Sequence, residues 1–114
     1  MIPIPAKFTA PLPASDDPAD AGLIEVERLR DALDAWSRSI KGKSDDDCDR
    51  IADRDTLLED FIAETPAHTL AGVAVKLRSL GRHSGGSTWT DPCVKTALAT
   101  VADLGRLAGK AVRA

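Results

Sequence analysis

Two apolar stripes with helical spacing, joined by a short link that contains glycine, constrain this chain more than any other feature. Between residues 18 and 64 apolar side chains recur every three or four positions, which places them on one side of each of two helices. The helices are expected over about 18–41 and 45–64, and the link Gly42-Lys43-Ser44 forces them antiparallel. The predicted core seam consists of Val26, Leu29, Leu33, Trp36, Ile40, Ile51, Leu58 and Ile62, with Cys48, Leu57 and Phe61 extending it.

Folding the stripes about this link brings them into register. Trp36 falls opposite Ile51, and Leu29 falls opposite Leu58. Asp55 is the one polar interruption, and we expect rotation of the helix to move it to the edge; the alternative is a polar position that sets register or oligomeric state. The charged residues of the first helix, which include Arg30, are expected to form a solvated surface.

Capping signals define where these helices begin. Asp16 or Asp17 is expected to cap the first helix with Pro18 in its first turn, and Ser44 or Asp45 to begin the second. Asp45, Asp47 and Asp49 have the spacing of a calcium loop, but position 6 is Arg50 and position 12 is Thr56, so the turn and the bidentate ligand are missing. Carboxylates that stabilise a helix N-terminus explain this acidic run.

Two further helices are predicted after the break at Thr65-Pro66. Thr69 is expected to cap a helix over about 70–81 that Gly81 ends, and Asp91-Pro92 opens another over about 92–111. The buried face of the first of these is expected to contain Leu70, Val73, Leu77 and Leu80.

The first fifteen residues are predicted to be an extended tail. Pro3, Pro5, Pro11 and Pro13 remove backbone donors and disfavour any helix there. Because the tail is unusually apolar, it is expected to lie in a groove between the helices or in a groove of a partner, rather than free. Phe8 of the tail is therefore a candidate anchor for a protein partner. Trp89 of the glycine-rich loop 81–89 is expected to fold back on the core, and a role as an exposed anchor is the alternative. The fold class is all-α, with residues 16–114 as a single domain.

Charge is distributed unevenly along the chain. Residues 1–60 contain 15 acidic and 8 basic side chains, whereas residues 61–114 contain 3 and 7. This asymmetry favours docking of one half on the other within the fold, with head-to-tail association or a basic face for an anionic partner as alternatives. The candidate basic face contains Lys76, Arg78, Arg82, Lys95, Arg106 and Lys110.

The residue inventory does not support catalysis. His68, His83 and two cysteines that are 45 positions apart lack the spacing of a zinc site or of a nucleophile and its base. We therefore expect no enzyme, metal or cofactor. No apolar segment approaches the roughly 20 residues that span a bilayer, and neither a secretory signal nor a paired-cysteine motif is present, so a cytoplasmic protein without membrane contact is expected.

Two segments resemble known proteins. The TPAxTLAGVxVKLR-like segment at residues 65–78 resembles a stretch of small uncharacterised helical proteins of bacteria and prophages, which implies such an origin and a helical context but no activity. Leu70-Ala71-Gly72-Val73-Ala74-Val75 is similar to the turn that precedes the recognition helix of helix-turn-helix repressors. That similarity implies contacts from residues 75–83 to DNA, but Pro66 interrupts the preceding helix, and a buried helix whose glycine permits close packing is favoured.

These observations favour a non-catalytic module for protein–protein interaction, such as a phage-associated inhibitor or adaptor, that offers its acidic hairpin or its basic C-terminal face. A nucleic-acid-binding protein that uses the basic face is the alternative, and a small enzyme ranks last. A second hairpin in a homodimer is another way to cover the apolar seam.

Overall fold

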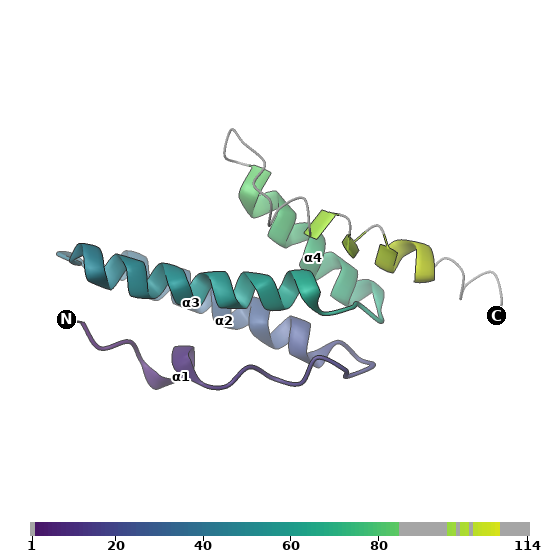
Figure 1. The fold of residues 1–114 in the computed structure, drawn as a ribbon, viewed down its shortest axis with the longest axis horizontal. Helices are drawn as coiled ribbons and strands as arrows, with labels where there is room; N and C mark the ends of the chain where they lie inside the picture. The colour runs from purple at the N-terminus through teal and green to yellow at the C-terminus, as the bar shows by residue number, and fades with distance from the viewer. Residues whose placement is uncertain (1, 85–95, 98, 101, 108–114) are drawn as a thin grey trace.

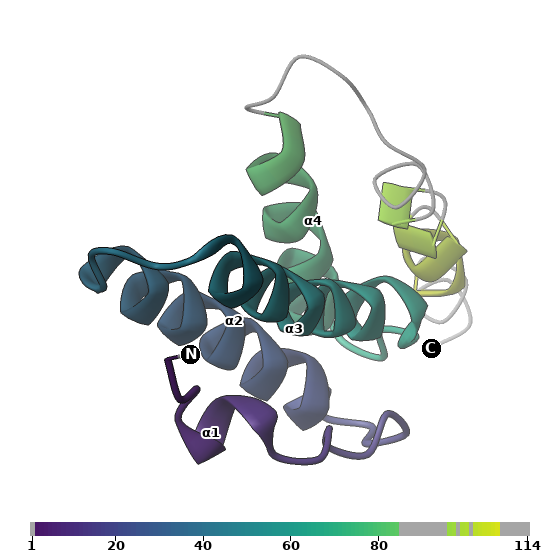
Figure 2. The same cartoon turned by 60° about the vertical axis from the view of Figure 1, so that its left-hand side comes forward.

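The chain folds into helices without a strand among the residues that the structure describes. The structure is a computed structural model that describes residues 2–84, 96–97, 99–100 and 102–107, with the side chains of 81–84 excepted. Its helices are α1 (Ala6–Thr9), α2 (Ala21–Ser39), α3 (Asp45–Glu64) and α4 (Leu70–Ser84). The tail lies on one side of the α2–α3 pair and α4 on the other (Figures 1 and 2).

Helices α2 and α3 form the predicted antiparallel hairpin. The Ser44 side chain accepts a hydrogen bond from the Asp47 backbone at 3.1 Å, and the Asp47 carboxylate accepts one from the Ser44 backbone at 3.2 Å. This capping box satisfies two free backbone donors and begins α3 where the sequence predicts. Gly42 supplies the positive φ of 74° that the link requires. Helix α2 ends at Ser39, three residues before this glycine.

The predicted start of α2 is wrong by several residues. Asp17 accepts a hydrogen bond from the Ala19 backbone at 2.7 Å, so Asp17 and the following residues form a turn instead of the first helical turn. The helix begins at Ala21 after Asp20, whose backbone is left-handed with φ 59° and whose side chain makes no capping bond within the described chain. The carboxylate of Asp20 is used elsewhere, at the start of α4.

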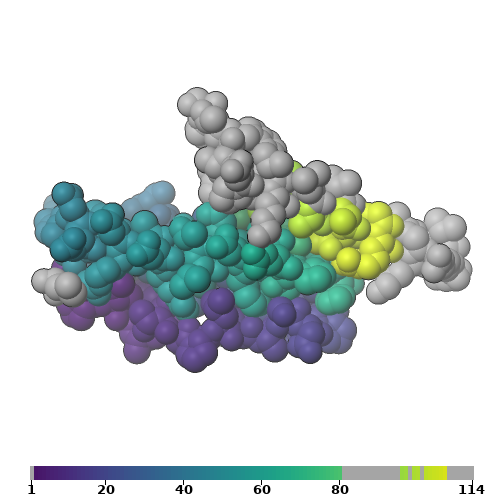
Figure 3. All heavy atoms as spheres, in the orientation of Figure 1, coloured from purple at the N-terminus to yellow at the C-terminus, as the bar shows by residue number. Residues whose placement is uncertain are grey.

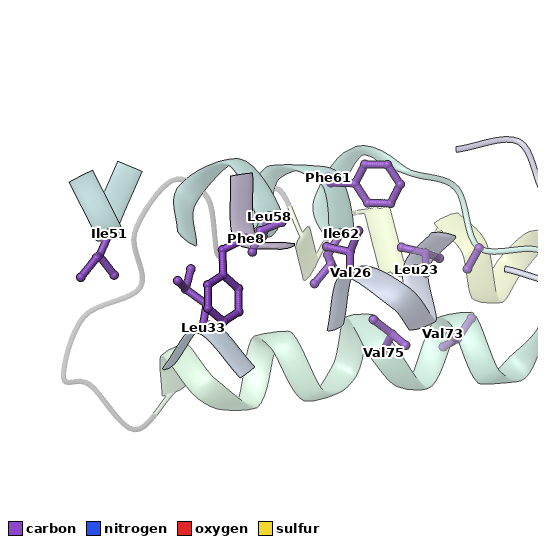
Figure 4. Close-up of a cluster of buried hydrophobic side chains, with 11 residues drawn as sticks. Phe8, Leu23, Val26, Leu33, Ile51, Leu58, Phe61, Ile62, Val73 and Val75 are labelled. Atoms are coloured by element: carbon purple, nitrogen blue, oxygen red, sulfur yellow. The ribbon is translucent and has the colours of Figure 1, made fainter. Parts of the chain in front are cut away.

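The hairpin seam forms most of the core. Val26, Leu33, Ile51, Leu58 and Ile62 are buried in one cluster (Figure 4). Leu29 and Trp36 pack against it. Phe61 joins the cluster as expected. Cys48 and Leu57 do not, because both lie on exposed faces of α3; Leu57 is 50% exposed. Ile40 does not join it either, because α2 ends at Ser39 and Ile40 lies half-buried beyond its end, outside the cluster.

Arg30 also departs from the prediction, because it is buried. Its guanidinium donates to both carboxylate oxygens of Asp55, at 2.8 and 3.3 Å, and to the Ser79 hydroxyl at 3.3 Å. Glu59 is 3.6 Å away. Burial disfavours the charged form, yet the hydrogen bond and charge of Asp55 raise the pKa of Arg30. Asp55 does rotate to the edge of the seam, as predicted, and its partner there is Arg30.

Helix α4 presents a different face to the hairpin from the one predicted. Thr69 caps it, since its hydroxyl accepts from the Gly72 backbone at 3.1 Å. However, Leu70 and Leu77 are exposed, and the buried positions are Gly72, Val73, Val75, Lys76 and Ser79. Gly81 does not end the helix, which continues to Ser84.

The position of α4 depends on Asp20. The Asp20 carboxylate accepts hydrogen bonds from the backbones of His68 and Thr69 at 2.7–2.9 Å and from the Thr69 hydroxyl at 2.7 Å. A Cβ at Gly72 would overlap the same carboxylate, so any larger residue there requires Asp20 to move. The glycine therefore permits close packing, as expected.

The tail is ordered against the hairpin, and part of it is helical. One turn, Ala6–Thr9, forms after Pro5, so the expectation that the prolines exclude all helix from residues 1–15 is wrong for these four residues. Proline is tolerated at this point because the first turn of a helix needs no donor from it. Residues on both sides of the turn follow the hairpin (Figure 3).

The described residues between 96 and 107 are helical, in agreement with the predicted helix over 92–111, whose other positions lie outside the described residues. Asp103 fixes this segment, because its carboxylate is 2.8 Å from the buried Lys76 ammonium and accepts a hydrogen bond from Arg106 at 2.8 Å.

Candidate interaction surface

An open groove of about 460 Å³ lies between α2 and α3 near the turn of the hairpin. We call it the turn groove. Its exposed apolar surface comes from Cys48 and Ala52 on the α3 side, and the core residues Leu33 and Ile51, 1% and 9% exposed, form its floor. The remaining residues that line it are polar or charged: Arg30, Asp34, Ser37, Arg38 and Asp55.

The charges of the turn groove differ in how firmly they are held. Arg30 and Asp55 are fixed by their bidentate hydrogen bond. Arg38 and Asp34 form an i,i+4 pair at 3.2 Å, but their side chains are 80% and 47% exposed. An exposed pair of this kind contributes at most about 1 kcal/mol, so both side chains are free to exchange partners.

An acidic stripe runs along α3 beside the turn groove. Asp45, Asp49 and Asp53 recur every four residues and are exposed, and Asp46 lies next to them. None of these four carboxylates forms an ion pair with another residue that the structure describes. The positive helix end stabilises those in the first turn, but this effect falls off by Asp49 and Asp53. Like charges at i,i+4 cost a few tenths of a kcal/mol per pair.

The basic side chains of α3 do not neutralise this stripe, because they face the tail. Arg50 donates to the carbonyl of Ile2 at 2.9 Å, and Arg54 donates to the carbonyl of Ala10 at 2.6 Å. Arg50 and Ala52 are separated by roughly 200° around the helix. The tail and the turn groove therefore lie on opposite sides of the hairpin seam.

The predicted basic face is not assembled by the residues that the structure describes. Lys76 is 1% exposed and pairs with Asp103, which corrects its placement on a solvent face. Arg78 is exposed, but both its Nε and its NH2 donate to Glu27, at 2.9 and 2.7 Å. Arg106 donates to the carbonyl of Ala67 and to Asp103. The side chain of Arg82, and all of Lys95 and Lys110, lie outside the described residues.

Buried ion pairs of this kind alter the titration of the groups involved. Burial raises the pKa of Asp103, but hydrogen bonds from Lys76 and Arg106 outweigh it and hold that pKa below its ordinary value. The sequence contains a signal for one buried ion pair, Arg30–Asp55. A carboxylate that lies in an apolar seam, as Asp55 does, is stabilised by a cation on the facing helix, and Arg30 lies within one helical turn of the position opposite Asp55.

Of the two candidate anchors, only Phe8 is described, and it is not exposed. It is 1% exposed, and its ring centroid is 5.7 Å from that of Trp36. The tail thus occupies a groove of its own hairpin, one of the two locations that its apolar content predicts. Trp89 lies outside the described residues.

A second depression, lined by Leu12, Pro13, Leu57 and Phe61 among others, lies between the tail and α3. Leu12 and Leu57 are 37% and 50% exposed.

Among the described side chains, no three His, Cys, Asp or Glu groups are placed to hold a metal ion. The described helices include none with the length and apolar character of a membrane span.

The fold and these surfaces define an all-helical domain built on an antiparallel hairpin. The N-terminal tail packs on one face of the hairpin, and the turn groove lies on the other. The chain matches no protein-family model, no curated protein and no solved structure.

Proposed function

We propose that the protein is a non-catalytic interaction module, in the class of inhibitors and adaptors, that binds a protein partner through the turn groove and the acidic stripe of α3. The observation that carries this proposal is their adjacency: an open groove with exposed apolar surface from Cys48 and Ala52, above the buried Leu33 and Ile51, lies beside carboxylates without a described ion pair. Charge complementarity then defines the partner. It is a basic segment with an apolar side chain that enters the groove and Lys or Arg residues that meet Asp49 and Asp53.

The alternative, nucleic-acid binding by the C-terminal half, receives less support. It requires exposed, uncommitted cations along α4 and the segment that follows. Of the side chains proposed for that role, Lys76 is buried, and Arg78 and Arg106 already bind carboxylates. The acidic hairpin would also repel a phosphate backbone.

The test is affinity capture with paired charge variants. The wild-type chain is used as bait beside Asp49→Asn/Asp53→Asn, and the control Asp16→Asn/Glu25→Gln removes the same charge from exposed positions away from the groove. A partner that is retained by wild type and by the control, but lost with Asp49→Asn/Asp53→Asn, supports the proposal. The partner should also elute at about 0.5 M salt, where charges are screened beyond a few ångströms.

Two results contradict the proposal. One is equal capture by all three baits, which would place the partner elsewhere on the molecule. The other is retention of duplex DNA that weakens steeply between 50 and 200 mM salt, which would favour the nucleic-acid alternative.

A further inference from the structure

The tail is held on the hairpin through its backbone and through two apolar side chains. The Ile2 backbone donates to Asp47 at 2.9 Å, and the carbonyls of Ile2 and Ala10 accept from Arg50 and Arg54. Because every one of these hydrogen bonds is to the tail's main chain, none of them depends on which side chains the tail carries.

The side chains of the tail contribute at only a few points. Phe8 is buried in the core cluster, where it groups with Leu33 and Leu58 (Figure 4), and Ile4 packs partly buried at the edge of that cluster. The residues between and after them are largely exposed, Lys7 and Thr9 included. Main-chain hydrogen bonds combined with a few side-chain pockets are how proteins bind peptide segments.

The connection between the tail and α2 is mostly exposed but is held at two points. Most of residues 9–19 are exposed. Arg54 donates to the carbonyl of Ala10, and Ala14 lies against Gly22, where an added Cβ would lie 2.5 Å from the Ala14 carbonyl and 3.3 Å from the Phe61 ring. A tether of this length presents the tail to its groove at an effective concentration on the order of 1 mM, so a segment of another molecule binds only when it overcomes that competition.

We infer that the hairpin face beneath residues 2–10, the tail groove, is a peptide-binding site that the tail closes as a tethered competitor. Its ligand is a segment of a protein partner that forms one helical turn, as Ala6–Thr9 does, with a β-branched residue before the turn and, four positions later, a large aromatic residue within it, as in Ile4 and Phe8. The site is separate from the turn groove, because Arg50 and Arg54 face the tail, whereas Cys48, Ala52 and Asp55 line the other side.

The experiment uses the full-length chain and a fluorescent peptide with the sequence of residues 2–13. Phe8→Ala in the protein weakens the tethered competitor and leaves the groove intact. Fluorescence anisotropy should therefore show that this variant binds the peptide at least 10-fold more tightly than wild type does. A peptide in which alanine replaces the phenylalanine should bind neither protein.

A second variant covers the case in which Phe8→Ala does not fold, as judged by circular dichroism. Gly22→Ala displaces the chain at Ala14, outside residues 2–10, and its only close contact with the hairpin is to the end of the Phe61 ring, so it should also strengthen peptide binding. A folded Phe8→Ala or Gly22→Ala protein that binds the peptide no better than wild type would overturn the inference and make the tail a purely structural strap. Asp49→Asn/Asp53→Asn should leave peptide binding unchanged, so failure here is distinguishable from failure of the turn-groove proposal.

Discussion

Asp20 determines how α4 meets the hairpin, and its replacement should be among the most damaging single changes in the chain. Its carboxylate accepts hydrogen bonds from the backbones of His68 and Thr69 and from the Thr69 hydroxyl. Asp20→Ala leaves these partly buried donors unpaired, and alanine tolerates the left-handed backbone poorly. We expect a loss of roughly 3 kcal/mol in the free energy of unfolding, measured by urea denaturation. Asp16→Ala, at an exposed position, is the control and should change stability by less than about 0.5 kcal/mol.

A substitution at Gly72 tests the contact between α4 and the Asp20 carboxylate from the α4 side. Gly72→Ala should destabilise the wild-type chain because its Cβ would overlap the Asp20 carboxylate. In the Asp20→Ala background that carboxylate is absent, and alanine is the better helix former by up to about 1 kcal/mol. The two substitutions should therefore be strongly non-additive in a double-mutant cycle. Additive losses would show that Gly72 is required for some reason other than Asp20.

The tail, as an element, should be held less firmly on the hairpin in acid. Hydrogen bonds from the Ile2 backbone and from Ser44 lower the pKa of Asp47 from 3.8 to about 2. A carboxylate whose pKa is lower in the folded state stabilises that state above its ordinary pKa and loses the effect as the pH falls toward the lowered value. Docking of the tail should therefore be intact above pH 4 and weaken between pH 4 and 2.

Trp36 reports this transition because Phe8 packs against it. In a Trp89→Phe background, the emission of Trp36 should shift to longer wavelength over that pH window as water reaches the ring. Asp47→Asn removes the titrating group and should flatten this change. If Asp47→Asn shows the same acid transition as wild type, other carboxylates are responsible for it.

The sequence predicts some of the helices and their buried faces well and others poorly. The hairpin follows from its spacing because two apolar stripes joined by a three-residue link bury each other when the helices lie antiparallel, and the Ser44 cap is a local signal. The buried face of α4 did not follow from the sequence, because it contains two polar residues whose partners are distant along the chain. Lys76 pairs with Asp103, 27 positions away, and Ser79 accepts from Arg30, 49 positions away. For the same reason the turn groove could not be predicted: it is defined by where α4 does not cover the hairpin.

For the molecule as a whole, the charge asymmetry of the sequence is partly resolved by internal docking, the outcome that it favoured. Arg78 of α4 binds Glu27 of α2 across the two halves, whereas Lys76 binds Asp103 within the C-terminal half. These internal ion pairs therefore engage cations of the C-terminal half with carboxylates that lie outside the acidic stripe. What remains exposed on α3 is negative, which is why the hairpin and not the C-terminal half is the better candidate for a charged partner.

The buried Lys76–Asp103 pair connects α4 to the helical residues 102–107, and its removal from one side should be costly. Asp103→Ala leaves the ammonium of Lys76, 1% exposed, with the carbonyl of Ala63 at 3.4 Å as its remaining described partner. Breaking a buried pair in this way costs about 3–5 kcal/mol, whereas replacing both members with apolar residues is often neutral. Lys76→Met/Asp103→Leu should therefore unfold at a higher urea concentration than Asp103→Ala does. A double variant that is less stable than Asp103→Ala would mean that the pair orders this part of the chain through its charge and not merely through burial.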